Sequence, residues 1–194
     1  KAGNAGFDLL CQPLKDLNKG KTRVWYPDRY FLMGNHENRI VRAAEDNAQL
    51  DGAVSLDHLN VKKWGWKVVP FLEEVELDGI SYSHYFYNPS TGRPYGGENL
   101  ATRLKTIGRS FTMGHQQGLN HATRPVGKRR HQGLVNGSCY LHDENYLGPQ
   151  GNNVWRGIVV CHQVENGMYD SMQVSLDFLC RKYENVKLAD FLKK

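Results

Sequence analysis

Three short apolar runs, each followed at once by a histidine-bearing loop, constrain the fold more than any other feature of this sequence. Residues 30–33 run into Gly34-Asn35-His36-Glu37, residues 80–83 run into His84, and residues 110–113 run into Gly114-His115. Short apolar runs bounded by glycine and polar residues are typical of buried strands. In α/β proteins the ends of such strands meet at one edge of a sheet, where ligands bind. The pattern therefore predicts a sheet with a polar site at that edge.

The rest of the chain alternates helices and strands early and forms hairpins late. Helices are predicted over 6–17, with a kink or break at Pro13, over 37–50, over 56–61 and over 98–107, ending at Gly108. Asp78-Gly79 and Asn166-Gly167 predict hairpins that join 71–77 to 80–84 and 154–164 to 168–176. A further strand is predicted over 134–140, loops over 88–97 and 114–131, and a last helix or extension over 177–194.

These elements predict an α/β (α+β) fold, either a mixed sheet or a two-sheet sandwich flanked by helices. The 194 residues fit one domain, 1–194, with a substantial core. Because the chain begins with Lys1 and shows no signal segment, we expect it to be the later part of a longer polypeptide.

Composition is that of an ordinary globular protein, with 40% hydrophobic and 23% charged residues. No apolar run approaches the roughly 20 residues that span a bilayer, and the four cysteines form no zinc or disulfide pattern, so we expect a cytoplasmic protein without membrane contact. The net charge of +5 mildly favours polyanionic partners. Its densest stretch, 124–131, is either a solvated loop or a loop that faces phosphate.

The ordered trio of Gly34-Asn35-His36-Glu37, His84 after a strand and Gly114-His115 after another strand resembles the calcineurin-like metallophosphoesterase superfamily. The loop Gly114-His115-Gln116-Gln117 and the segment Asn136-Gly137-Ser138 are similar to members encoded by bacteriophages. The resemblance covers roughly residues 30–176. It implies a two-sheet sandwich flanked by helices, and in this chain one that lacks its first strands.

The resemblance also implies a hydrolase with two divalent metal ions, Mn²⁺ above all and otherwise Fe²⁺, Zn²⁺ or Mg²⁺. Asn35, His84 and His115 would be ligands of one ion. His36 would be the general acid that protonates the leaving group, because the pKa of a histidine lies near neutrality. A metal-activated hydroxide would attack phosphorus in line. Arg39, one helical turn after His36, either contacts phosphate or forms a surface ion pair with Glu37 or Asp46.

The chain departs from the family pattern at two places. Where the family has a second histidine two residues after the first, this chain has Gln117, so either Gln117 or His121 would complete the site of the other metal ion. The family's upstream Asp-x-His and Gly-Asp-x-x-Asp motifs have no counterpart before Gly34. We therefore expect the missing ligands upstream of Lys1. Alone, this segment would bind at most one metal and be inactive.

The leading hypothesis is a metal-dependent phosphoesterase that hydrolyses phosphodiesters, and the resemblance favours a phage nuclease acting in the host cytoplasm. The alternative is a non-catalytic descendant that binds protein or nucleic acid. A third hypothesis is a single-stranded nucleic-acid binder that stacks bases on Trp64, Trp66 and residues 85–87, although core packing explains these aromatics better. The oligomeric state stays open.

Overall fold

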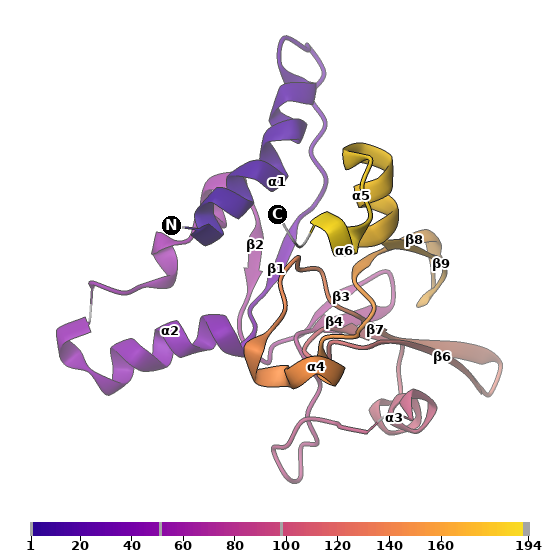
Figure 1. Cartoon of the computed structure of the whole chain (residues 1–194). Helices are drawn as coiled ribbons and strands as arrows, with labels where there is room; N and C mark the ends of the chain where they lie inside the picture. The colour runs from indigo at the N-terminus through magenta and orange to yellow at the C-terminus, as the bar shows by residue number, and fades with distance from the viewer. Residues whose placement is uncertain (1, 51, 98, 192–194) are drawn as a thin grey trace. The chain divides into compact units, whose positions relative to one another are not determined.

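The computed structural model describes residues 2–50, 52–97 and 99–191. The chain divides into two compact units, Lys1–Glu73 and Glu74–Lys194, whose elements are labelled in Figure 1. The prediction of one domain stays a prediction, because two compact units can belong to a single domain. Glu98, where a helix was predicted to begin, and residues 192–194 of the predicted tail lie outside the described residues.

The first unit combines helices with a two-stranded parallel sheet. Its elements are α1 (Ala2–Asn18), β1 (Tyr30–Leu32), α2 (Asn35–Asp46), the 3₁₀ helices η1 (Ala48–Leu50), η2 (Leu56–His58) and η3 (Lys62–Trp64), and β2 (Lys67–Val69). Strand β1 pairs with β2 in parallel, Tyr30 opposite Lys67. Helix α1 continues through Pro13 as one element, so the chain does not break there.

Helix α1 packs against the segment that leads into β2. The indole N–H of Trp64 donates to the Asp8 carboxylate at 2.7 Å, and the Phe7 ring lies 6.0 Å from the Trp66 ring. The expectation that these tryptophans pack within the protein is confirmed. Lys63 and Trp64 together hold the pKa of Asp8 below its usual value, chiefly through the Trp64 hydrogen bond.

The second unit is built on a five-stranded mixed sheet in the order β3-β4-β5-β7-β6. The strands are β3 (Val75–Leu77), β4 (Ile80–Ser83), β5 (Phe111–Met113), β6 (Leu119–Val126) and β7 (Arg129–Asn136). A separate hairpin joins β8 (Gly157–Glu165) to β9 (Met168–Ser175). Its helices are α3 (Leu100–Ile107), η4 (Asn145–Leu147), α4 (Gly148–Gly151), α5 (Leu176–Glu184) and α6 (Leu188–Phe191).

The five-stranded sheet is covered on both faces. On one face α3 packs against β6 and β7, and Leu104 joins Phe111 and Val135 in the core. On the other face Tyr169 of β9 packs with Ile80 and Leu134. Neighbouring residues 134 and 135 thus serve opposite cores, as the strand period of two requires. The prediction of a mixed α+β fold is confirmed.

The prediction of a polar loop over 114–131 is wrong. Residues 119–126 form β6, and Arg129 already begins β7, which pairs antiparallel with β6. Strand β6 lies at the sheet edge, and an edge strand tolerates both exposed polar side chains and a residue such as Pro125 that lacks an N–H donor. The predicted strand over 134–140 also ends earlier, at Asn136.

Both predicted hairpins are confirmed, and residues 88–97 form no helix or strand of the sheet. None of the helices in the described part of the chain is both long and apolar enough to cross a membrane.

Candidate functional site

Three parallel strands of the second unit end level with one another. Strands β4, β5 and β7 are parallel, and their register places Ser83 opposite Met113 and Met113 opposite Val135. The next residues along the chain are His84, Gly114 and Asn136. The predicted convergence of polar loops at one sheet edge is therefore confirmed for His84 and the Gly114-His115 loop.

The imidazoles of His84 and His115 lie next to each other at this edge. Nε2 of His84 is 3.1 Å from Nδ1 of His115, and the ring centroids are 5.0 Å apart. The ring of Tyr85 lies 5.0 Å from that of His115 and covers one side of the pair. Two nitrogens bound to one ion at 2.0–2.1 Å lie about 2.9 Å apart at a right angle and about 3.3 Å apart in a tetrahedron. The observed separation falls between these values.

His115 occupies a backbone conformation that side-chain-bearing residues seldom adopt. Its φ is 60°, and the Gln116 N–H donates to the Gly114 carbonyl at 2.7 Å, which closes a three-residue turn. Turns of this kind with positive φ are strained and need support from the surrounding structure. Here the strain orients the His115 ring toward His84.

A buried arginine supplies that support. Arg103 of α3 is 4% exposed and donates to Gln116 Oε1 at 2.7 Å and to the Gly97 carbonyl. Burial lowers the pKa of this guanidinium. Helix α3 is thereby tied directly to the loop that carries His115.

Gln117, one of the two residues considered for the missing ligand, has both ends of its amide engaged. Its Oε1 accepts from the Tyr140 hydroxyl at 3.1 Å, and its Nε2 donates to the Tyr146 hydroxyl at 3.2 Å. Its backbone carbonyl accepts from Ser138 at 3.1 Å. Gln117 thus connects the His115 loop to the segment that follows β7.

His121, the other residue considered, is not part of that loop. It lies in β6 opposite Leu134, and β7 separates it from β5. Neighbouring atoms desolvate the ring and lower the pKa of His121, although the residue as a whole is exposed. Nothing in this arrangement brings His121 toward His115.

Asn136 is a site residue that sequence reasoning missed. Its side-chain oxygen lies 3.9 Å from the point where a Cβ on Gly114 would stand, and His84 Nδ1 lies 4.0 Å from the same point. The absence of a side chain at Gly114 leaves this space open between the two groups. The signal in the sequence was Gly137, which ends β7 at φ 71°.

Asn35, His36 and Arg39 all lie on α2 of the first unit. The Glu37 carboxylate accepts from the Gly34 N–H at 2.9 Å and fixes the first turn. His36 and Arg39 are exposed, and Asn35 is half-buried. Among the described residues Arg39 forms no ion pair with Glu37 or Asp46, the alternative considered for it.

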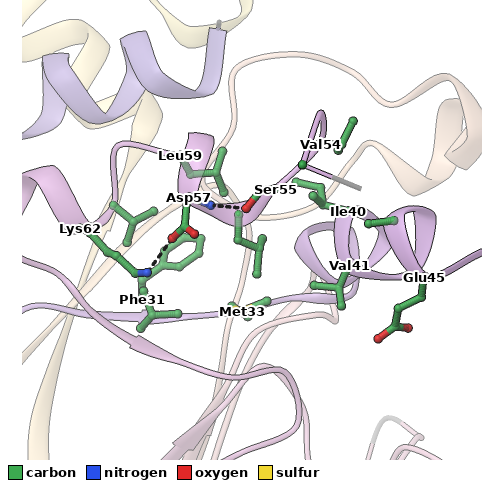
Figure 2. Close-up of a pocket in the computed structure, with 15 residues that line it drawn as sticks. Phe31, Met33, Ile40, Val41, Glu45, Val54, Ser55, Asp57, Leu59 and Lys62 are labelled. Atoms are coloured by element: carbon green, nitrogen blue, oxygen red, sulfur yellow. Dashed lines mark hydrogen bonds and ion pairs between the residues drawn. The ribbon is translucent and has the colours of Figure 1, made fainter. Parts of the chain in front are cut away.

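The opposite side of α2 borders a pocket of about 700 Å³ within the first unit. Figure 2 shows Ile40 and Val41 facing it together with Phe31 and Met33, and the Asp57–Lys62 ion pair of 2.6 Å at its side. None of the residues proposed for chemistry lines this pocket. Its walls are mostly apolar, and its charged lining residues are Glu45 and the Asp57–Lys62 pair.

The remaining histidines are scattered. His58 accepts a hydrogen bond from the Ser55 N–H at 3.3 Å, His142 pairs with Glu144 at 3.0 Å, and His162 is exposed on β8. His131 is the third residue of β7 and so lies toward the end of the sheet opposite to His84. Within the described residues, no three His, Cys, Asp or Glu side chains are grouped so that they could hold a metal ion. The donors that gather near His84 and His115 are thus two imidazoles and an amide oxygen.

The chain matches no protein-family model, and no curated protein and no solved structure matches it.

Proposed function

We propose that this chain is a metallophosphoesterase that hydrolyses phosphodiester bonds with the help of divalent metal ions, and that its second unit represents the later part of the two-sheet sandwich of that superfamily. The observation that carries the proposal is the His84–His115 pair, whose ring nitrogens lie 3.1 Å apart at the ends of two parallel strands. A spacing of this size suits two adjacent ligands of one ion.

The donor chemistry fits a borderline metal. Imidazole nitrogens and amide oxygens suit Mn²⁺, Fe²⁺ and Zn²⁺, so His84, His115 and Asn35 are the proposed ligands. Bound metal ions would supply Lewis-acid stabilisation of the charge that develops on the phosphoryl oxygens. Since these ligands are neutral, we expect weak binding unless carboxylates from further chain complete the centre.

The chain's own residues would position the substrate and transfer protons. His36, exposed on the first turn of α2, is the proposed general acid for the leaving oxygen. Arg39 is available as a phosphate contact because it has no described ion-pair partner. Arg103 would hold the His115 loop in place through Gln116.

The test is hydrolysis of bis-(p-nitrophenyl) phosphate and of p-nitrophenyl phosphate under added Mn²⁺, with metal content measured in parallel. It is run on this chain and on a longer polypeptide that contains it. We expect His36→Ala to abolish turnover without loss of metal, and His84→Ala and His115→Ala to abolish both. His162→Ala, an exposed histidine on β8, serves as the control. Absence of metal and turnover in both proteins would reject the enzyme.

The alternative is a non-catalytic scaffold that binds protein or nucleic acid. One observation favours it: both ends of the Gln117 amide are occupied by tyrosines, so this side chain already has a structural role. A protein that binds partners but neither binds metal nor turns over either phosphate ester would support this alternative.

A further inference from the structure

The end of the sheet opposite to the histidine pair carries a basic hollow. It has a volume of about 660 Å³ and is bordered by the starts of β4, β5 and β7 and by the turn between β8 and β9. Its lining residues are Glu76, Gly79, Arg109, Ser110, Arg129, Arg130, His131, Asn166 and Met168. We propose that this hollow and the β6–β7 hairpin beside it bind the phosphate backbone of a nucleic acid.

The floor of the hollow is rigid. The Gly167 N–H donates to the Asp78 carbonyl at 2.8 Å, and a Cβ added to Gly167 would stand 2.7 Å from the Gly79 carbonyl oxygen. Ser110 accepts from the Gln132 N–H at 3.0 Å and joins β5 to β7. The hairpin turns and strand starts therefore form a preformed cradle, which lowers the ordering cost of binding.

The cations around this cradle differ in whether they are neutralised. Arg109 pairs with Glu74 and donates to Ser81 at 2.9 Å, so its charge is compensated. Arg129 and Arg130 take part in none of the ion pairs among the described residues, and both are exposed. Glu76 is the one carboxylate in the lining, which leaves an excess of positive charge.

The same hairpin carries further unpaired cations. Arg124 stands opposite His131, and Lys128 lies in the turn between β6 and β7. Nδ1 of His131 is buried and has no hydrogen-bond partner within the described residues. The register places Arg130 opposite Pro125 and Arg129 opposite Val126, so no carboxylate faces either guanidinium across the hairpin, and a phosphate can bind them.

Arginine forks favour nucleic acid over a membrane surface, and residues 125–130 at the hairpin tip contain a single large apolar side chain, the exposed Val126, among basic residues. Guanidinium groups bind phosphate oxygens in pairs. A membrane-binding tip would carry aromatic and large apolar residues, whereas the turn here is Gly127-Lys128. In Figure 1 the β6–β7 hairpin extends as a narrow arm of the sheet, a shape that can follow a groove.

The length of β7 determines how the basic hollow could contribute to the proposed hydrolysis, an inference that rests on the proposed function. From Arg129 to Asn136 the strand spans roughly 23 Å at about 3.3 Å per residue. The basic end therefore lies too far away to contact the phosphate at His84 and His115. It would bind the backbone about seven base pairs from the scissile bond. The substrate is then a polynucleotide and not a mononucleotide.

The test is binding of fluorescein-labelled 20-nucleotide single strands and duplexes in EDTA, followed by anisotropy at several salt concentrations. We expect R129A/R130A to weaken binding about ten-fold and to reduce the slope of log affinity against log salt by about 1.4 on single strands. R129K/R130K retains the charge and should retain most of the binding. K182A/K187A removes two exposed charges from the end of the unit where β9 leads into α5, and should change affinity less than about two-fold.

Equal losses in R129A/R130A and K182A/K187A, or no salt dependence, would overturn the proposal. So would variant-sensitive binding to phosphatidylserine vesicles without binding to oligonucleotides. The binding measurement needs no turnover, so it tests the nucleic-acid proposal even if the phosphoesterase hypothesis is wrong. In an active protein, R129A/R130A should leave hydrolysis of bis-(p-nitrophenyl) phosphate unchanged, because that substrate cannot reach the basic end.

Discussion

Arg103 is the residue on which the geometry of the His115 loop depends. Its guanidinium lies in the core beside Met113 and donates to Gln116 and to the Gly97 carbonyl, while its buried Nε has no hydrogen-bond partner among the described residues. We predict that Arg103→Met lowers the free energy of unfolding by about 2–4 kcal/mol, because the Gln116 and Gly97 oxygens lose their charged donor. Urea denaturation measures this change. Arg93→Met, at an exposed site without a described side-chain partner, is the matched control, and an equal loss there would contradict the prediction.

The buried phenol of Tyr169 should make the free energy of unfolding depend on pH in the alkaline range. Burial raises the pKa of its phenol to about 12. In the unfolded chain a tyrosine has a pKa of about 10. From about pH 10 upward the unfolded state releases this proton while the folded state keeps it, so rising pH favours unfolding, and below that range this group contributes no slope.

The expected result is that the free energy of unfolding of the wild type falls more steeply between pH 9 and pH 11 than that of Tyr169→Phe. The variant keeps the ring that packs with Ile80 and Leu134 but has no proton to release. Some slope should remain, because burial also raises the pKa of Tyr82. Tyr183→Phe, which alters a residue 67% exposed, should behave as the wild type does. Parallel curves for wild type and Tyr169→Phe would contradict the prediction.

At the scale of elements, the backbone at the start of β8 is closely packed at Gly157. A Cβ on Gly157 would stand 2.4 Å from the Val174 carbonyl oxygen and 2.5 Å from the Trp155 ring. We predict that Gly157→Ala destabilises the protein by about 3 kcal/mol, because strand pairing and the indole must both shift. Gly118→Ala has open space around it and should be nearly neutral. Thermal denaturation of the two variants measures the difference in stability. Equal midpoints would contradict the prediction and show that β8 can shift to accommodate a Cβ.

The elements that could be predicted from sequence are those whose signals are local. Asp78-Gly79 and Asn166-Gly167 each combine two residues with positive φ, at 51° and 80° and at 50° and 81°, which is the geometry of a tight hairpin turn. Strand β6 was missed because its central residues include polar and basic side chains and Pro125, which lacks an N–H donor. β6 pairs with β7 at the edge of the sheet, and no local sequence pattern predicts this pairing.

The residues of the candidate site likewise differ in whether a local sequence signal predicts them. His84 and His115 could be predicted, because each directly follows an apolar run that forms a central parallel strand. Asn136 was not predicted as a site residue, since residues 134–140 were expected to form one strand interrupted by a glycine. What ends β7 is the contact of Gly137 with Trp155, where an added Cβ would stand 2.7 Å from the ring. The engagement of Gln117 by Tyr140 and Tyr146 is likewise a contact between distant residues.

For the molecule as a whole, the proposed residues are divided between the two compact units. Asn35, His36 and Arg39 belong to the first unit, and His84 and His115 belong to the second. The parallel strand order of the second unit positions its histidines independently of the first unit. The proposed general acid His36 and the proposed imidazole ligands therefore lie in different units, and variants in each unit test the two proposed roles one at a time.

The melting temperature of the whole chain, with and without Mn²⁺, tests which of these histidines take part in metal binding. A ligand that binds only the folded state stabilises it by RT ln(1 + [L]/Kd), about 2.7 kcal/mol at one hundred times Kd. We predict that millimolar Mn²⁺ raises the melting temperature of the wild type by a few degrees, on the order of 2–4 °C per kcal/mol. His84→Ala and His115→Ala should each lose this shift, because either change leaves one imidazole of the pair. His36→Ala and His162→Ala should keep it, since a general acid and an exposed strand residue bind no ion. A shift that survives in His84→Ala and His115→Ala would mean that Mn²⁺ binds elsewhere, and the pair would then be an ordinary hydrogen bond between two histidines.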